Sequence, residues 1–188
     1  DSGSVIVCTD KETFNINNAR NKLTKALAVN PYLKGREWVY RDIEPMIIAE
    51  KYIKSSYSTD IDDYKVFCFN GEAELIQHDF NRSTNHRRNL YSTDWDFINS
   101  TFEYSNDSSK IIKKPSCINR ILDLSALLSK NVPFLRVDFY IIDDEVFFGE
   151  LTFYPESGLG TFTPETLNDN MGSLIDLSEH QFNSKNIY

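Results

Sequence analysis

The stretch that decides the fold is Arg136–Gly160, RVDFYIIDDEVFFGELTFYPESGLG. The segment 134–142 that enters it is rich in Val, Ile, Phe and Tyr, and this composition with its alternation predicts a β-strand. Asp143-Asp144 is typical of a tight turn, and residues 145–152 predict the returning antiparallel strand. The sequence therefore predicts a β-hairpin, followed by a Pro/Ser/Gly loop of the kind that often carries function.

Charged side chains alternate on this hairpin. Arg136 and Asp138 share one face of the first strand, and Glu150 and Thr152 share one face of the second. We expect Asp138 and Glu150 to be near neighbours, and two carboxylates on apolar strands repel each other unless a cation lies between them. Such hard oxygen ligands suit Mg²⁺, and Arg136 adds a fixed cation for a phosphate. An edge-strand ion-pair network without chemistry is the alternative interpretation.

Composition limits the classes of protein that the chain can belong to. Its 188 residues and 40% hydrophobic content predict one folded domain with a real core. A formal net charge of −8 argues against a nucleic-acid binder that depends on phosphate contacts. No apolar run reaches the length of a membrane span. The three cysteines, Cys8, Cys68 and Cys117, have no metal spacing and predict buried or free thiols in a reducing, cytoplasmic compartment.

The rest of the chain predicts further strands and helices. Asn70-Gly71 between two alternating runs is the strongest hairpin signal. We also expect strands at 5–8 and at 45–53, and a long functional or mobile loop over 79–104. Helices are predicted from Asn15 or Asn17 to before Pro31, from Pro115-Ser116 with Ser116 as the cap, and from Pro164. Helices beside antiparallel hairpins predict an α+β architecture.

Several single residues have a plain structural interpretation. We expect His78 to be a surface or satisfied histidine, His180 to be inert, and Trp95 to be a core or loop anchor. A strand lysine such as Lys65 most often faces solvent. For His86, beside Arg87-Arg88, two interpretations stay open: part of a charged surface, or a phosphate contact. The second is considered because histidine titrates near neutral pH.

Five segments in this order resemble the ATP-grasp superfamily, and more closely its TupA-like family, which is associated with teichuronopeptide and capsular polysaccharide biosynthesis. The segments are IIAEKYI (47–53), DYKVFCFNGE (63–72), HRRNLY (86–91) with Asp94-Trp95, PFLRVDFY (133–140) and FGELTFYPESGLG (148–160). The resemblance covers essentially the whole chain. It implies an α+β ATP-grasp domain over 1–188, with a nucleotide-clamp part at 1–53 and a metal, phosphate and acceptor part at 54–188.

The resemblance also implies roles for particular residues. Adenine would be bound by the hinge residues Glu50, Lys51, Tyr52 and Ile53, ribose by Asp63, and the phosphates by the loop Ser2, Gly3 and Ser4, with Lys65 as a further nucleotide contact. Asp138, Glu150 and Thr152 would hold Mg²⁺. Arg136 would stabilise the transferring phosphoryl group, and Arg87 or Arg88 would be a second phosphate contact. Ser157 and Gly158 would bind the acceptor.

Two departures from the superfamily pattern stand out. Thr152 occupies the position where many members have Asn as the third metal ligand. The phosphate-binding lysine of the superfamily would lie upstream of Asp1, so we expect an N-terminal part to be missing and this chain alone to be inactive.

The implied reaction joins a carboxylate and an amine at the expense of ATP, through an acyl phosphate. Catalysis of this kind is mostly positioning and charge neutralisation. The expected partners are ATP, an amino acid or other amine, and a carboxylate acceptor such as a uronic acid, and we expect no nucleic acid. Two other classes stay open: a glycosyltransferase-type enzyme of polysaccharide biosynthesis, and a non-catalytic nucleotide-binding module. A kinase of the same fold is a close relative of the ligase.

Overall fold

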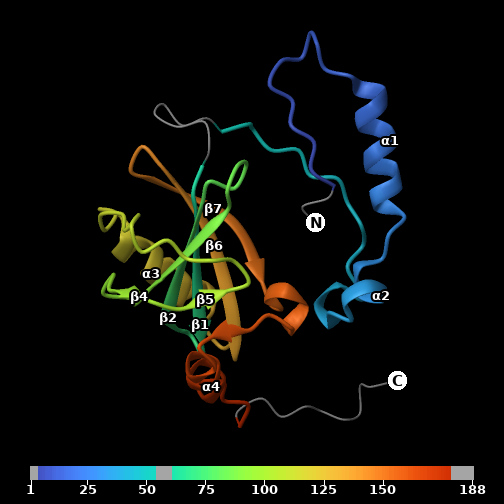
Figure 1. The fold of residues 1–188 in the computed structure, drawn as a ribbon. Coiled ribbons are helices and arrows are strands. Elements are labelled where there is room, and N and C mark those ends of the chain that lie inside the picture. The colour runs from blue at the N-terminus through green and yellow to red at the C-terminus, as the bar shows by residue number, and fades with distance from the viewer. Residues whose placement is uncertain (1–3, 54–60, 179–188) are drawn as a thin grey trace. The chain divides into compact units, whose positions relative to one another are not determined.

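The computed structural model describes residues 4–53 and 61–178 (Figure 1). The chain divides into two compact units, Asp1–Lys54 and Ser55–Tyr188, which we describe separately. Ser2 and Gly3 of the expected phosphate loop, and His180, lie outside the described residues.

The first unit is helical where it has regular structure. Helix α1 covers Ile16–Leu27, and the Asn15 side chain caps it by accepting a hydrogen bond from the Asn18 N–H at 2.9 Å. The short helix α2 is Pro31–Gly35, with proline in its first turn, and the 3₁₀-helix η2 is Trp38–Tyr40. The predicted first helix and its end before Pro31 are therefore confirmed.

The two strands predicted in this unit are wrong. Residues 5–8 and 45–53 have no strand assignment, and Met46 and Ile48 are largely exposed, at 74% and 79%. A strand must pair its backbone N–H and C=O groups with a neighbour. Among residues 4–53 no ladder supplies such a neighbour, so apolar β-branched composition alone does not make these segments strands.

The second unit is built on a six-stranded antiparallel sheet of order β4-β3-β2-β1-β6-β7. The strands along the chain are β1 (Asp63–Phe69), β2 (Glu72–Phe80), β3 (Arg87–Tyr91), β4 (Phe97–Ile98), β6 (Phe134–Ile142) and β7 (Glu145–Thr152). A two-stranded sheet pairs β5 (Thr101–Phe102) with β8 (Phe162–Thr163). Helix α3 (Ile118–Leu128), 3₁₀-helix η3 (Pro155–Gly158) and helix α4 (Glu165–Ser173) complete the unit.

Both predicted hairpins are confirmed, and each turns on two residues with positive φ. Asn70 and Gly71 have φ of 51° and 89°, and Asp143 and Asp144 have φ of 53° and 65°. These are the conformations that a two-residue hairpin turn requires. An irregularity between Val137 and Phe139 shifts the register of the second hairpin close to the charged residues.

Segment 79–104 is not a long loop, so that prediction is wrong. It contains the end of β2 and the whole of β3, β4 and β5. The apolar–polar alternation that predicts a strand is hidden in this segment. Asp79, Arg88 and Asn89 occupy buried strand positions where apolar residues are expected. The cap of α3 is also corrected: Cys117 is the N-cap residue, and the Ser116 hydroxyl donates instead to Asp144 Oδ1 at 2.7 Å.

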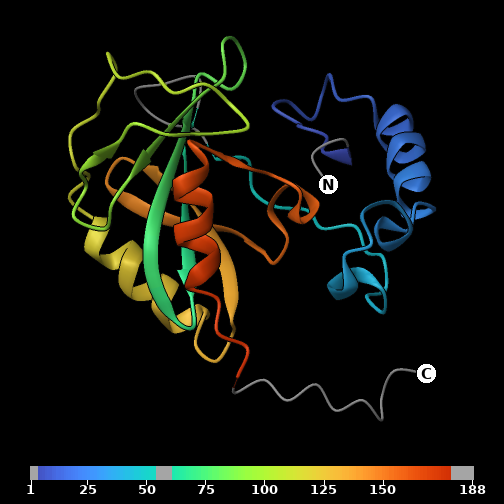
Figure 2. The same cartoon turned by 60° about the horizontal axis from the view of Figure 1, so that its bottom comes forward.

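The large sheet has two different faces, and Figure 2 shows α3 and α4 on opposite sides of it. One face packs against α3 through a core that includes Val66, Ile76, Val137 and Ile121. Half of the other face is a phenylalanine-rich cluster covered by β5, β8 and α4. The remaining half carries charged side chains, and this half positions the candidate site.

Candidate functional site

A row of polar and charged side chains crosses four strands of the sheet on the face opposite α3. We call these residues the polar row: Asp63, Lys65, Gln77, Asp79, Arg88, Arg136 and Asp138. Each is at most 8% exposed. Strand alternation gathers them, because residues two apart on β1, β2 and β6 share a face and the register places Lys65 between Asp138 and Gln77.

Asp138 on β6 is bound by two cations. Arg136 donates from Nε to Oδ1 and from Nη2 to Oδ2, both at 2.8 Å, and Lys65 Nζ donates to Oδ2 at 2.5 Å. Arg136 Nη2 also lies 3.2 Å from Thr152 Oγ1 and 3.7 Å from Glu150 Oε1. Burial alone would lower the pKa of Arg136, but the bonds to Asp138 raise it above its ordinary value. The cation between the two hairpin carboxylates is therefore Arg136 itself.

Asp63, at the start of β1, is held between Arg82 and the same Lys65. Arg82, from the connection between β2 and β3, forms an ion pair with Asp63, and Lys65 Nζ lies 3.6 Å from the same oxygen. Burial raises the pKa of Asp63 in spite of these cations. Lys65 is only 8% exposed, so the expectation that it faces solvent is wrong.

Asp79 and Arg88 form the end of the row on β2 and β3. Arg88 donates from Nε and Nη2 to the two Asp79 oxygens at 2.6 and 2.9 Å, and from Nη1 to the Phe102 carbonyl at 2.9 Å. Gln77 Nε2 also donates to Asp79, at 3.1 Å. Burial would raise the pKa of Asp79, but the Arg88 hydrogen bonds and charge hold it below its ordinary value. The Arg88 guanidinium thus donates its hydrogen bonds to groups within the protein.

Gln77, Asp79 and Arg82 were missed by the sequence analysis, because a register shift between Phe67 and Cys68 hides the pairing of Asp63 with Asp79. Counting back from the Asn70-Gly71 turn, where Phe69 pairs with Glu72, would instead place His78 opposite Asp63. Two carboxylates in opposite positions of a ladder are destabilising without cations. Their pairing therefore requires basic residues nearby, and the chain supplies Lys65, Arg82 and Arg88.

The other candidate residues lie elsewhere. Ser4 and the hinge residues Glu50, Lys51, Tyr52 and Ile53 belong to the first unit, where Glu50 and Lys51 are exposed and Tyr52 is 46% exposed. Arg87 is adjacent to Arg88 on β3, so it points to the opposite face of the sheet. Ser157 and Gly158 lie in η3, where Glu156, Ser157 and Gly158 have φ of 50°, 57° and 75°.

The remaining single residues are also located. His78 is fully buried, with Nε2 3.0 Å from Asp62 Oδ2 and, among the residues that the structure describes, no hydrogen-bond partner for Nδ1, so it is not a surface histidine. His86 packs against Tyr104 with ring centroids 3.9 Å apart and the rings tilted by 34°, and burial lowers the pKa of His86. Trp95 is confirmed as an anchor, because it stacks on Tyr91 and donates to the Ile112 carbonyl. The three cysteines are free.

The metal ligands expected from the sequence fit Mg²⁺ only if phosphate oxygens supply the remaining ligands of the ion. Asp138, Glu150 and Thr152 offer hard oxygens at one end of the polar row, and Mg²⁺ usually takes one or two carboxylates plus phosphate oxygens. Within 4–53 and 61–178, no group of three or more His, Cys, Asp or Glu side chains could form an all-protein cage. A nucleotide phosphate is therefore the expected remaining ligand.

Fold and site together define a class of protein. Antiparallel hairpins with helices, and an Arg-x-Asp strand paired with a Glu-x-Thr strand, are what the ATP-grasp resemblance implies. The family model described as TupA-like ATPgrasp matches residues 1–176, and the chain belongs to this family. Membership supports a general ATP-grasp ligase that binds ATP. Searches of curated proteins and of solved structures found no match. In the part of the chain that the structure describes, no helix is long and apolar enough to cross a membrane.

Proposed function

We propose that the protein is an ATP-dependent carboxylate–amine ligase that forms an amide through an acyl phosphate. The observation that carries the proposal is the polar row, in which Lys65 and Arg136 are buried beside Asp138 in a member of the TupA-like ATP-grasp family. Buried, fixed cations are what stabilisation of a transferring phosphoryl group requires, because this chemistry depends on positioning and on charge neutralisation.

The reaction has two steps. A carboxylate oxygen of the acceptor attacks the γ-phosphorus of ATP, the bond to the β-phosphate oxygen breaks, and ADP leaves with its electron pair. The amine nitrogen then attacks the acyl carbon, phosphate departs, and the amine loses a proton. Arg136 and Lys65 would stabilise the charge on the phosphoryl oxygens, and Arg136 would do so as a permanent cation.

Nucleotide contacts are assigned by position in the family pattern. Glu50, Lys51, Tyr52 and Ile53 would bind adenine through backbone atoms, and Ser2, Gly3 and Ser4 would close over the phosphates. Asp63 would bind the ribose hydroxyls, which requires Arg82 to release it, because the carboxylate is only 1% exposed. Arg88 is engaged by Asp79, so its role would be to support the site.

Asp138, Glu150 and Thr152 would hold Mg²⁺, which supplies charge neutralisation for the phosphates when bound. Asp138 would then exchange part of its bonding to Lys65 and Arg136 for the ion, which frees these cations for phosphate oxygens. Arg87 would be a further phosphate contact. Ser157 and Gly158, in a loop with three consecutive positive φ values, would bind the acceptor carboxylate through hydroxyl and backbone N–H.

The proposed product is a cell-surface polysaccharide, or its precursor, that carries an amino acid. The acceptor would be a uronic acid, and the reaction would take place in the cytoplasm, where ATP is available. This part of the proposal rests on the association of the TupA-like family with teichuronopeptide and capsule synthesis.

The test is Mg²⁺-dependent ATP binding by titration calorimetry, with Asp138→Asn/Glu150→Gln as the variant. Asp143→Asn is the matched control, because Asp143 lies in the turn of the same hairpin and is exposed. We expect the double variant to lose metal-dependent binding and the control to keep it. ADP release with amino acids and uronic acids then tests the ligase. Equal affinity in all three proteins would refute the metal role.

The second candidate is a non-catalytic nucleotide-binding module. It is favoured by one observation: both oxygens of Asp138 already have cationic partners within the protein. It predicts ATP binding without phosphate release.

A further inference from the structure

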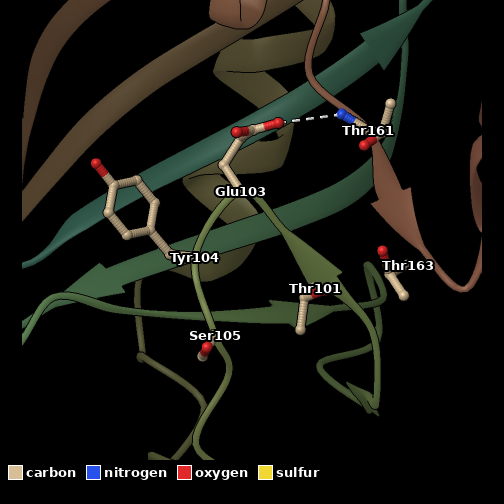
Figure 3. A pocket seen from close by; sticks show the side chains of 6 residues that line it. All are labelled: Thr101, Glu103, Tyr104, Ser105, Thr161 and Thr163. Carbon is tan, nitrogen blue, oxygen red and sulfur yellow. Dashed lines mark hydrogen bonds between the residues drawn. The ribbon is translucent and has the colours of Figure 1, made fainter.

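A small polar hollow lies on the two-stranded sheet of β5 and β8, apart from the polar row. Its volume is about 240 Å³, and it is lined by Thr101, Glu103, Tyr104, Ser105, Thr161 and Thr163 (Figure 3). Thr101 and Thr163 are partners in the ladder, and the next pair, Phe102 and Phe162, points into the phenylalanine-rich cluster. Strand alternation therefore places the threonine hydroxyls on the outer face of this sheet.

Glu103 has a strained backbone at the centre of the hollow. Its φ is 61°, and the Tyr104 N–H donates to the Phe102 carbonyl at 2.7 Å across it. A three-residue turn closed in this way around a residue with positive φ is rare and strained. Such strain tends to occur where function needs it, and it persists when neighbouring contacts enforce it.

Those neighbouring contacts are present. The Glu103 carboxylate accepts a hydrogen bond from the Thr161 N–H at 3.2 Å, which Figure 3 shows joining the residue after β5 to the residue before β8. On the other side, Arg88 fixes the chain by donating from its backbone N–H to the Ser105 carbonyl at 3.2 Å, and its guanidinium lies 4.8 Å from the Tyr104 ring centre. These contacts tie Glu103 to Thr161 and the following residues to Arg88 on β3.

The side chains that line the hollow include hydrogen-bond acceptors throughout and no group that only donates. Five of its six side chains carry a hydroxyl, which donates and accepts, and the sixth is a carboxylate, which only accepts. Glu103 is the only charged residue among the six, so the lining itself carries a negative charge, while the nearby Arg88 guanidinium is paired with Asp79. Phosphate would be repelled, and the volume is below the roughly 300–1,000 Å³ of ordinary ligand pockets, so a nucleotide does not fit. A primary ammonium group, with three donors and no acceptor, matches this surface.

We propose that the hollow binds a small primary-ammonium compound, whose charged nitrogen contacts Glu103 and whose other polar groups contact Thr101, Thr163 and Ser105. This site is separate from the proposed ATP site, and the inference does not depend on ligase activity.

Ethanolamine, which has one ammonium and one hydroxyl group, is the probe. The ¹H–¹⁵N spectrum of the full chain is recorded during titration, with glycerol and acetate as the neutral and anionic comparisons. We expect saturable shifts of the Thr101, Glu103, Thr161 and Thr163 amides with ethanolamine alone. Prior addition of ATP and Mg²⁺ should leave these shifts unchanged, which separates this proposal from the ligase proposal.

Glu103→Gln is the decisive variant, because its side-chain oxygen can still accept from Thr161 while the charge is lost. We expect affinity for ethanolamine to fall at least about tenfold, the effect of losing a charge-assisted hydrogen bond. Glu72→Gln, an exposed site with the same charge change, should bind as the wild type does. Thr101→Val, of similar shape but without a hydroxyl, should weaken binding less than Glu103→Gln. The proposal is overturned by unchanged affinity in Glu103→Gln, by equal shifts with glycerol or acetate, or by shifts that do not saturate.

Discussion

Removing the charge of Asp79 should lower the free energy of unfolding of the second unit more than a substitution at an exposed position does. Asp79→Asn leaves one oxygen where Arg88 now has two acceptors, at 2.6 and 2.9 Å, and it leaves the guanidinium only 4% exposed. Breaking a buried ion pair by changing one partner costs about 3–5 kcal/mol, since an uncompensated charge stays buried. Because domains are stable by about 5–15 kcal/mol, this is a large part of the total.

The measurement is urea unfolding of the full chain, followed by far-ultraviolet circular dichroism and by tryptophan fluorescence. With a slope of about 1–3 kcal/mol per molar urea, we expect the midpoint for Asp79→Asn to fall by at least about 1 M. Asp94→Asn is the control, because Asp94 is exposed in the turn between β3 and β4. Its effect should stay within about 0.5 kcal/mol.

A second variant separates loss of the ion pair from loss of packing. Asp79→Leu with Arg88→Met replaces the pair by apolar groups, which is often nearly neutral for a buried ion pair. The double variant should therefore be more stable than Asp79→Asn. The reasoning is refuted if Asp79→Asn costs no more than Asp94→Asn, or if the double variant is the less stable of the two.

Three further predictions concern stability. First, because the folded pKa of Asp79 is depressed, its contribution is present above the unfolded pKa of about 3.9 and is lost as pH falls through the folded pKa. The gap in unfolding free energy between wild type and Asp79→Asn should therefore shrink in acid, and a constant gap from pH 7 to pH 2 would contradict this. Second, Gly149→Ala should cost about 1–3 kcal/mol in urea unfolding, because an added Cβ would lie 3.0 Å from the Asp138 carbonyl oxygen. Third, Gly172→Ala in α4 should raise the thermal midpoint, with a gain of about 0.5–1 kcal/mol, because nothing lies within 4 Å of the added carbon. A lower midpoint would show that α4 does not form as described.

Short-range sequence signals predicted the local elements well where turn chemistry was explicit. Asn70-Gly71 and Asp143-Asp144 each marked a two-residue turn, and Asn15 marked the start of α1. The same kind of reasoning failed for residues 5–8 and 45–53, because a strand depends on a partner that composition does not reveal. It failed for β3 because Arg88 and Asn89 looked like loop residues.

For the candidate site, the sequence placed Arg136 and Asp138 on one face of a strand, and the structure brings Lys65 to the same carboxylate. The roles of these residues in binding ATP and Mg²⁺ stay predictions. The pairing of Asp79 with Arg88, and the separation of Arg87 from Arg88 onto opposite faces, needed the strand order and the register.

The sequence by itself determined the α+β class, the two hairpins and the membership of the TupA-like ATP-grasp family, since these follow from turn residues, alternation and the order of motifs. Only the tertiary structure decided which cation neutralises which buried carboxylate. A charged side chain on a strand looks the same in sequence whether it faces water or a partner 73 residues away, as Lys65 and Asp138 are. The cost of burying an unpaired charge selects the partner, and that choice depends on the sheet that brings the strands together.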